Sequence, residues 1–224
     1  MKPLNLTQAT QMLALQDKMN VAVAPDWLQR DFPFLRAVVV EAGEALDHLG
    51  WKWWKKQEPD LQQVIIEFVD ILHFFLSHFL MQVNGDIQKA AQLLTNCSNP
   101  LCSCVDFDGK KISIDKSDLR SLIELLAGLA VARRAELPVL EACFWSVGIS
   151  WDDVVVQYIS KNVLNIFRQK NGYKEGTYIK TWDGKEDNVR LIELLEDLDV
   201  KSDNFSDDLF IALTRRYSTV GSQA

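Results

Sequence analysis

The sequence is most informative at LQQVIIEFVDILHFFLSHFLMQV, residues 61–83. Apolar side chains recur there at helical spacing and cover most of the circumference, so the segment predicts a helix in the middle of the fold. It is long enough to cross a membrane, but Glu67, Asp70, His73 and His78 interrupt it, which favours a buried helix of a soluble protein. Two of these residues, Glu67 and Asp70, are acids three positions apart.

A second pair of acids, Glu41 and Glu44, lies in the preceding apolar segment, Phe34 to Leu49. At about 100° per residue, an i,i+3 spacing places both members of a pair on one helical face. Two such helices, packed side by side across residues 50–60, would gather four carboxylates, which repel each other unless their pKa values rise or a cation binds. Oxygen-only ligands favour Mg²⁺, with Mn²⁺ also possible, and Mg²⁺ commonly takes phosphate oxygens as further ligands. The pattern therefore indicates phosphate chemistry.

Simpler interpretations exist for each of these features. A single E-x-x-E pair is usually a solvated helix face that pairs with lysines, but two pairs in apolar helices favour a metal site. His73 is interpreted as a packed or substrate-contacting residue rather than a metal ligand. A ferritin-like di-iron site would need two Glu-x-x-His motifs, which the sequence lacks. The tryptophans of residues 51–54 belong partly to the core, or one of them stacks on a base.

Composition limits the classes of function. The chain has 224 residues, 48% of them hydrophobic and 25% charged, which predicts one globular domain over residues 1–224. The net charge of −7 argues against a polyanion-binding surface, so no nucleic acid polymer is expected as a partner. Because we find neither a signal peptide pattern nor a membrane span, we expect a cytoplasmic protein. Cys97, Cys102, Cys104 and Cys143 lack paired spacing and are predicted to be reduced thiols.

Helical spacing recurs along most of the chain, and residues 85–116 are expected to form a variable, loop-rich connection with a short strand near 111–114. Ser150 and Asp153 resemble a capping box at the start of a helix. We predict an all-α fold, an antiparallel bundle of seven to eight helices. Besides the two acidic helices, the predicted helical segments are Leu4–Asn20, Leu119–Ala135, the segment after Pro138, Trp151–Lys170, a segment from Asp187 or Asn188 to Leu198, and Asp207–Tyr217.

A basic face lies on the predicted helix Trp151–Lys170. Lys161, Asn165 and Arg168 follow i, i+4, i+7 and share one side, and Lys174 continues the positive charge into a glycine-containing loop, residues 172–176. Cationic side chains beside the N–H groups of a Gly-rich turn are typical of a phosphate-binding cradle. A solvated helix end is the alternative. Placed opposite a metal site, this face would hold a polyphosphate from its other side.

These motifs follow one another in a recognisable order: Glu41-Ala-Gly-Glu44, Trp51-Lys-Trp-Trp-Lys55, Ile66-Glu-Phe-Val-Asp70-Ile-Leu-His-Phe74, Lys161-Asn-Val-Leu-Asn-Ile-Phe-Arg-Gln169, Asn171-Gly-Tyr-Lys174, Gly176, Tyr178, Lys180-Thr-Trp182 and Glu186-Asp-Asn188. The combination resembles the dimeric, all-α dUTPase family from Met12 to about Leu195. The carboxylate pairs alone would fit any all-α nucleoside triphosphate pyrophosphohydrolase, whereas the block 161–188 is much more specific.

The resemblance implies a homodimer that hydrolyses dUTP, and also dUDP, in a Mg²⁺-dependent reaction. The products from dUTP would be dUMP and pyrophosphate, with attack at the β-phosphorus. Such an activity keeps uracil out of DNA and supplies dUMP for thymidylate synthesis. Departures from the family pattern lie in the variable middle region and bear on loop and dimer details.

The resemblance also implies roles for individual residues. Glu41, Glu44, Glu67 and Asp70 would bind the metal. Gln16, Asn20 and Asn188 would contact the uracil, and Trp53 and His73 with Phe74 would wall the base and sugar. Arg168, Lys174, Tyr178 and Lys180 would hold the phosphates, with Lys161 and Asn165 nearby.

Charge and hydrogen bonding suggest how such a site would work. Glu44 is the preferred base for deprotonating a metal-bound water. Side-chain amides of Gln16 and Asn188 can match O4, N3–H and O2 of uracil, and cytosine inverts two of these groups, which would exclude dCTP. Two alternatives remain open. One is a pyrophosphohydrolase of the same architecture for another nucleotide such as dCTP, and the other is a non-catalytic helical protein that binds metal or nucleotide.

Overall fold

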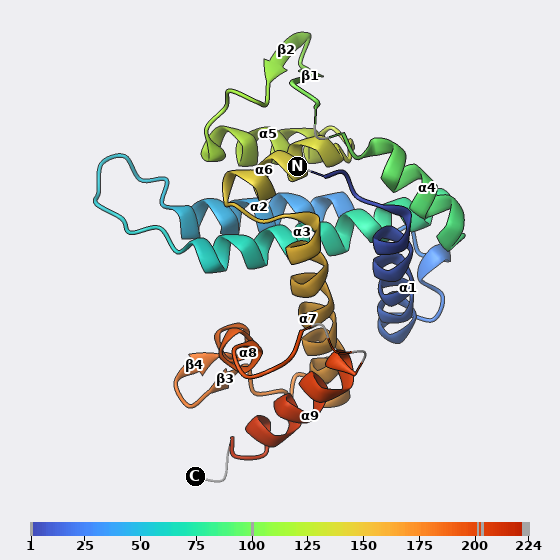
Figure 1. Cartoon of the computed structure of the whole chain (residues 1–224), viewed down its shortest axis with the longest axis vertical. Coiled ribbons are helices and arrows are strands. Elements are labelled where there is room, and N and C mark those ends of the chain that lie inside the picture. Colours follow the sequence, from blue (N-terminus) through green and yellow to red (C-terminus); the bar gives the residue numbers. More distant parts are fainter. Residues whose placement is uncertain (1, 100, 201, 203, 221–224) are drawn as a thin grey trace.

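The computed structural model describes residues 2–99, 101–200, 202 and 204–220, which are mainly helical (Figure 1). The α-helices of these residues are α1 (Leu6–Val23), α2 (Phe34–Leu49), α3 (Leu61–Gln82), α4 (Ile87–Cys97), α5 (Leu119–Val131), α6 (Leu137–Ser146), α7 (Trp151–Lys170), α8 (Asp187–Leu195) and α9 (Phe205–Tyr217). The remaining elements are a 3-10 helix (Trp27–Gln29) and two antiparallel hairpins, β1 (Cys104–Phe107) with β2 (Lys110–Ser113) and β3 (Thr181–Trp182) with β4 (Lys185–Glu186). The predicted all-α class is confirmed.

The central helix is α3, which lies antiparallel to α2 and packs along it (Figure 1). Side chains on several sides of α3, among them Phe68, Ile71 and Leu80, are completely buried, as expected for a helix whose circumference is almost entirely apolar. It is also the one described helix that is long and apolar enough to cross a membrane, and most of it is buried inside the fold. Gly50, in a positive-φ conformation at +79°, ends α2 at the predicted position.

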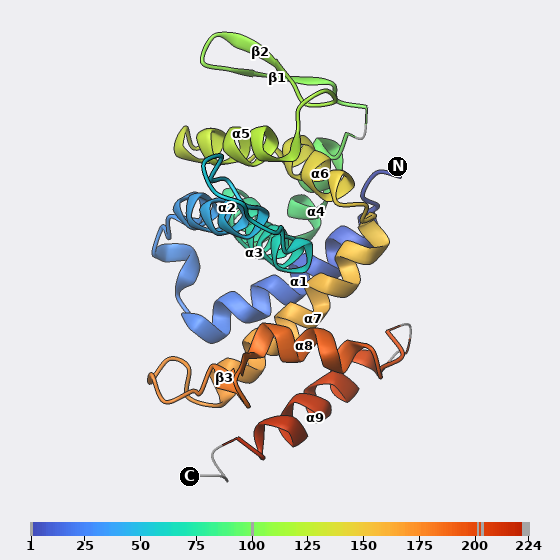
Figure 2. The same cartoon turned by 90° about the vertical axis from the view of Figure 1, so that its left-hand side faces the viewer.

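The helices form layers around the α2–α3 pair (Figure 2). Helices α5 and α6 lie on one side of this pair, while α1 and α7 lie on the other. Helix α7 begins at the predicted capping box, in which the Ser150 side chain accepts from the Asp153 N–H and the Asp153 carboxylate accepts from the Ser150 N–H. From there α7 crosses α3 steeply (Figure 1). At this crossing Lys161 of α7 contacts Asp70 of α3.

Residues 85–116 contain more regular structure than expected. The strand predicted near residues 111–114 is present as β2, but α4 was not predicted. Its buried face consists of Ala90, Ala91 and Leu94. Ile87, Ala90, Ala91 and Leu94 follow the i, i+3, i+4, i+7 spacing of an amphipathic helix, so the expectation of a loop-rich connection was wrong for this segment.

The C-terminal elements attach to the far end of α7. Helix α8 begins at Asp187 but ends at Leu195 rather than Leu198. Helix α9 packs against α7 through an aromatic cluster centred on Phe167, whose ring centroid lies 5.4 Å from that of Tyr217 and 5.6 Å from that of Phe210. The strands β3 and β4 fold into a short hairpin that contributes Trp182 to this cluster.

Candidate active site

The antiparallel packing of α2 and α3 brings their acidic faces together. One carboxylate oxygen each from Glu41, Glu67 and Asp70 lies within 4.8 Å of the others. Glu67 is buried, with 5% of its surface exposed, and the other two are half-buried. We call these three residues the carboxylate trio. The trio contains three of the four acids that were predicted to bind metal.

The electrostatics of the trio indicate a need for positive charge. Burial, followed by the negative charge of Asp70, raises the pKa of Glu41 to about 7 and the pKa of Glu67 to about 8. At neutral pH Glu67 therefore largely keeps its proton and Glu41 keeps part of its own, unless a cation takes their place. Because every donor atom is a carboxylate oxygen, the trio fits a hard divalent cation such as Mg²⁺ or Mn²⁺.

Glu44, the fourth acid, is exposed and lies outside the trio. Its negative charge nevertheless contributes to the raised pKa values of Glu41 and Glu67, which means that it is close to both. An exposed carboxylate next to a buried cluster is accessible to water while remaining within the electric field of the site.

Helix α7 places two cations beside the trio. The Lys161 ammonium lies 2.7 Å from Asp70 Oδ2, and its side chain is only 4% exposed. Arg168 forms a bidentate pair with the fully buried Asp187, in which its Nε donates to Oδ2 at 2.8 Å and its Nη2 donates to Oδ1 at 2.7 Å. Arg168 Nη1 donates to Asn165 Oδ1 at 3.0 Å. Asp187 therefore holds the guanidinium in one orientation at the edge of the site.

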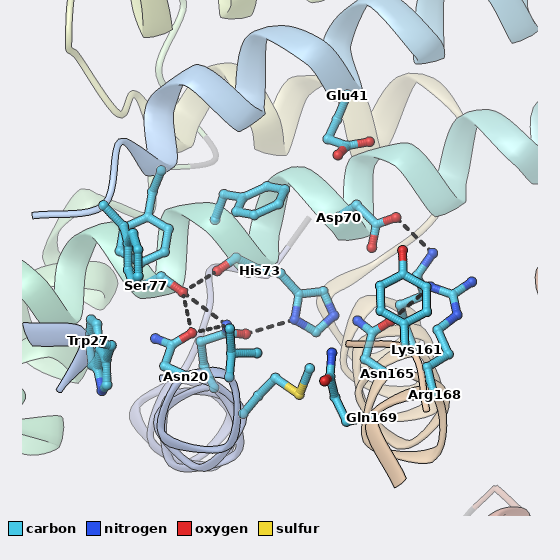
Figure 3. Close-up of a pocket in the computed structure, with 17 residues that line it drawn as sticks. Asn20, Trp27, Glu41, Asp70, His73, Ser77, Lys161, Asn165, Arg168 and Gln169 are labelled. Carbon is cyan, nitrogen blue, oxygen red and sulfur yellow. Dashed lines mark hydrogen bonds and ion pairs between the residues drawn. The ribbon is translucent and has the colours of Figure 1, made fainter. Parts of the chain in front are cut away.

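A cavity of about 340 Å³ connects these groups (Figure 3). Glu41, Asp70, Lys161 and Arg168 line one side of it, and Trp27 lies at the opposite side. The other lining residues are Gln16, Met19, Asn20, Val23, Phe32, Phe34, His73, Phe74, Ser77, Asn165, Gln169 and Tyr173. The cavity is thus charged at one end and apolar with a few polar groups at the other, which suits a ligand with a phosphate chain and an aromatic base.

A buried hydrogen-bond relay crosses the wall of the cavity. Gln16 Nε2 donates to Asn20 Oδ1 at 3.0 Å and to Ser77 Oγ at 2.9 Å. Gln16 Oε1 accepts from the Tyr158 hydroxyl at 2.8 Å and lies 2.7 Å from His73 Nδ1. All the hydrogen-bonding groups of the Gln16 amide are therefore engaged with protein.

The two ends of the relay have free polar atoms. Burial lowers the pKa of His73 to about 4, so its ring is neutral, and the Gln16 oxygen beside Nδ1 requires the proton to be on that nitrogen. His73 Nε2 is then a hydrogen-bond acceptor, and it lacks a protein partner. Asn20 Nδ2 is a donor that also lacks one. Buried polar atoms of this kind indicate that a ligand or water completes them.

Several predicted site residues are not among those that line the cavity, although the Lys174 ammonium lies 3.5 Å from the carbonyl oxygen of Val23, which does line it. Trp53 is 86% exposed and packs on Trp54, with the ring centroids 4.6 Å apart. Lys174 and Lys180 are both exposed, and the Lys180 ammonium lies 3.1 Å from Glu186. The sequence placed these three residues around the base or the phosphates, and the structure does not bring them together with the trio.

Two further predicted residues, Tyr178 and Asn188, do not line the cavity but contact the cations or their carboxylate partner. The Tyr178 hydroxyl donates to Asp187 Oδ2 at 2.8 Å. Asn188 Oδ1 accepts from Lys161 Nζ at 3.1 Å and from Arg168 Nη2 at 3.2 Å. Asn188 was predicted to read the base, but here its oxygen lies between the two cations.

The structure also reveals site residues that the sequence did not single out. Trp27, Phe32 and Phe34 form the apolar end of the cavity, and Ser77 and Tyr158 complete the relay. The first three lie in or beside a short 3-10 turn without a regular period, and a buried serine or tyrosine inside a helix carries no local signal of its partners. The roles of Ser77 and Tyr158 become visible only where α1 packs against α3 and α7.

The comparison with protein families agrees with this geometry. The family model described as dUTPase matches residues 8–173. The chain belongs to the dUTPase family. The match covers most of the chain and includes the whole trio and every residue that lines the cavity. A search among curated proteins gives no match.

Membership makes this dUTPase a dUTP diphosphatase, and it decides against the non-catalytic alternative. Enzymes of the family depend in general on divalent metal ions, in agreement with the oxygen donor set of the trio. The matched region ends at residue 173, so Tyr178, Lys180 and Asn188 lie beyond it.

Proposed function

We propose that this dUTPase uses Mg²⁺ to convert dUTP to dUMP and pyrophosphate, that it also accepts dUDP, and that it acts as a homodimer in the cytoplasm. The observation that carries the proposal is the arrangement of one cavity. Glu41 and Asp70 of the carboxylate trio and two cations line one end, and a buried relay with two polar atoms that lack a protein partner lies along the wall.

Metal binding is assigned to the trio together with Glu44. A divalent cation held there would withdraw charge from phosphorus and lower the pKa of a water molecule. Glu44 is the residue proposed to take the proton from the attacking water, because it is exposed to solvent and is not buried in the trio. Lys161 and Arg168, with Asn165, would bind the phosphate oxygens and offset the charge that develops on them.

Base recognition is assigned to the relay. Because the Gln16 amide is saturated, its proposed role is to orient Asn20 and His73, whose free atoms face the ligand. Asn20 Nδ2 would donate to a carbonyl of uracil, and the amino group of cytosine at that position would leave two donors facing each other. Such a mismatch costs about 1–3 kcal/mol. Trp27 and Phe34 would pack against the base in the cavity.

The activity can be tested by measuring pyrophosphate release from dUTP, dCTP, dTTP and UTP, with and without Mg²⁺. Among these four triphosphates we expect hydrolysis of dUTP alone, and only with a divalent metal. Glu44→Gln should lower kcat by about 10²–10⁴-fold because the base is lost. Glu58→Gln is a matched control, since Glu58 is exposed in the loop after α2 and pairs with Lys56. Preferred release from dCTP would contradict the proposal.

Three finer points need separate measurements. In ¹⁸O-labelled water, attack at the β-phosphorus places the label in pyrophosphate, whereas attack at the α-phosphorus places it in dUMP. Phosphate release from dUDP tests the second substrate. Light scattering should give twice the chain mass of 25.6 kDa for a homodimer, and cell fractionation tests the proposed location.

A further inference from the structure

Lys161 is a buried cation shared between the acids and the cavity. Its side chain is 4% exposed, its ammonium contacts Asp70 Oδ2 at 2.7 Å, and it donates to Asn188 Oδ1 at 3.1 Å. It also lines the cavity (Figure 3). A buried ammonium requires such partners because it has given up most of its hydration.

The charge of Lys161 acts on the whole trio. It lowers the pKa values of both Glu41 and Glu67, opposing burial and the charge of Asp70. Among the ion pairs of the described residues, the other contact to the trio is His48 Nε2, 3.5 Å from Glu67 Oε1, and this imidazole is charged only when protonated. Lys161 is therefore the lysine ammonium positioned beside the three acids.

A divalent metal ion and the ammonium would compete for this place. Both require Asp70 oxygen, and like charges a few ångströms apart repel strongly where water is scarce. Arg168 does not have this conflict, because its carboxylate partner Asp187 lies outside the trio.

We propose that Lys161 is the internal counter-cation of the carboxylate trio in the ligand-free enzyme, and that metal binding displaces its ammonium from Asp70 and frees it for the phosphate chain. This inference rests on the metal site of the proposed function. It makes metal and phosphate binding mutually favourable, because the first event releases the group that the second requires.

The first test is Mn²⁺ binding by the whole protein without nucleotide, measured by calorimetry or by the electron paramagnetic resonance signal of free Mn²⁺. Lys161→Met keeps the length of the side chain but removes the competing charge, so it should bind Mn²⁺ about 10-fold more tightly than the wild type. Lys161→Arg keeps the charge and should stay within about twofold of the wild type. Unchanged or weaker Mn²⁺ binding by Lys161→Met would overturn the inference.

Lys185→Met provides the matched control. It makes the same change in net charge, but Lys185 is exposed and its ammonium lies 2.6 Å from Glu193, away from the trio. Its Mn²⁺ affinity should equal that of the wild type. Equal tightening in both methionine variants would attribute the effect to net charge and would refute a specific role of Lys161.

A second test observes the Lys161 ammonium directly in the wild-type protein. Without metal, the buried Lys161 ammonium should give a protected ¹⁵N–¹H signal, assigned by its loss in Lys161→Met. Saturation with Mg²⁺ alone should shift or remove this signal, while the signals of exposed lysines stay in place. A signal that remains unchanged at saturating Mg²⁺ would show that Asp70 keeps the lysine, and the inference would be wrong.

The two proposals fail in different ways. A wild-type protein that binds Mn²⁺ and hydrolyses dUTP, but whose Lys161 signal ignores Mg²⁺, refutes the counter-cation alone. A wild-type protein that binds no Mn²⁺ and needs no metal for hydrolysis refutes both.

Discussion

The carboxyl group of Glu67 lies in the buried face of α3, next to two other acids, and its chemistry depends on what balances its charge. Burial, and after it the charge of Asp70, raises its pKa to about 8, whereas the ordinary value is 4.5. The folded, metal-free protein therefore keeps a proton on this group at pH values where the unfolded chain has lost it. The free energy of unfolding must then fall as the pH rises between these two values.

We expect the free energy of unfolding in EDTA to decrease on the order of 1–3 kcal/mol from pH 5 to pH 8, as measured by urea denaturation. Glu67→Gln should flatten this dependence, because the amide does not titrate. Added Mg²⁺ should restore stability at pH 8, since the metal replaces the protons. The exposed Glu58→Gln serves as the control and should retain the slope. An unchanged slope in Glu67→Gln would place the titration elsewhere.

The turn that follows the basic face of α7 depends on two glycines. Gly172 and Gly176 both have positive φ, at +87° and +72°. They were expected to offer N–H groups to phosphate, but the Gly176 N–H donates to the Tyr173 carbonyl inside the turn. The surroundings of the two glycines differ. A Cβ on Gly172 would lie 2.0 Å from Thr177 Oγ1, whereas one on Gly176 would meet open space.

Gly176→Ala should cost about 1 kcal/mol of unfolding free energy, the penalty of positive φ for a residue with a Cβ. Gly172→Ala carries the same penalty plus the clash, so we expect roughly 2–3 kcal/mol and a higher KM for dUTP, because Tyr173 in the cavity wall would shift. In a Thr177→Ala background the difference between the two glycine variants should shrink. If the two glycine variants differ in unfolding free energy by the same amount with and without the Thr177→Ala substitution, the steric account is wrong.

At the scale of the whole molecule, the C-terminal elements reach the site indirectly. The Tyr217 ring of α9 stacks on Tyr178, with centroids 5.3 Å apart and planes at 19°, and its hydroxyl accepts from the Ile179 N–H at 3.1 Å. Tyr178 donates to Asp187, which in turn orients Arg168. A segment outside the matched family region thus supports a cation inside it.

Tyr217→Ala should lower the unfolding free energy by about 2 kcal/mol and reduce kcat/KM for dUTP, because the support of Arg168 loosens. Tyr217→Phe keeps the stacking and should retain most of both quantities. Ile211→Ala on the exposed side of α9 should change stability by less than about 0.5 kcal/mol. If Tyr217→Ala loses stability without any change in kcat/KM, α9 supports only the fold.

Local patterns were sufficient for the helices that carry the chemistry. The boundaries of α2 and α7 were predicted to the residue, and those of α3 to within one, because large apolar side chains, caps and terminal glycines act within a few residues of one another. Helix α4 has the same kind of apolar period, but it is short and is followed by Asn, Ser, Cys and Gly, residues typical of loops, so it was not predicted. The residues of the apolar cavity end lie in or beside a turn without a period.

Local patterns in the chain are sufficient to predict that this protein is helical, that two of its helices carry paired acids and a third carries cations, and that its motifs resemble those of the dUTPase family. The tertiary structure decided which of these groups meet. Lys161 reaches Asp70 because α7 crosses α3, Asp187 holds Arg168 from a separate helix, and Trp53 is turned to solvent while Trp27 lines the cavity. The physical reason is that local and long-range interactions fix different things. Helical periodicity places a side chain on a face of its own helix, whereas the partner of that face depends on how distant helices pack.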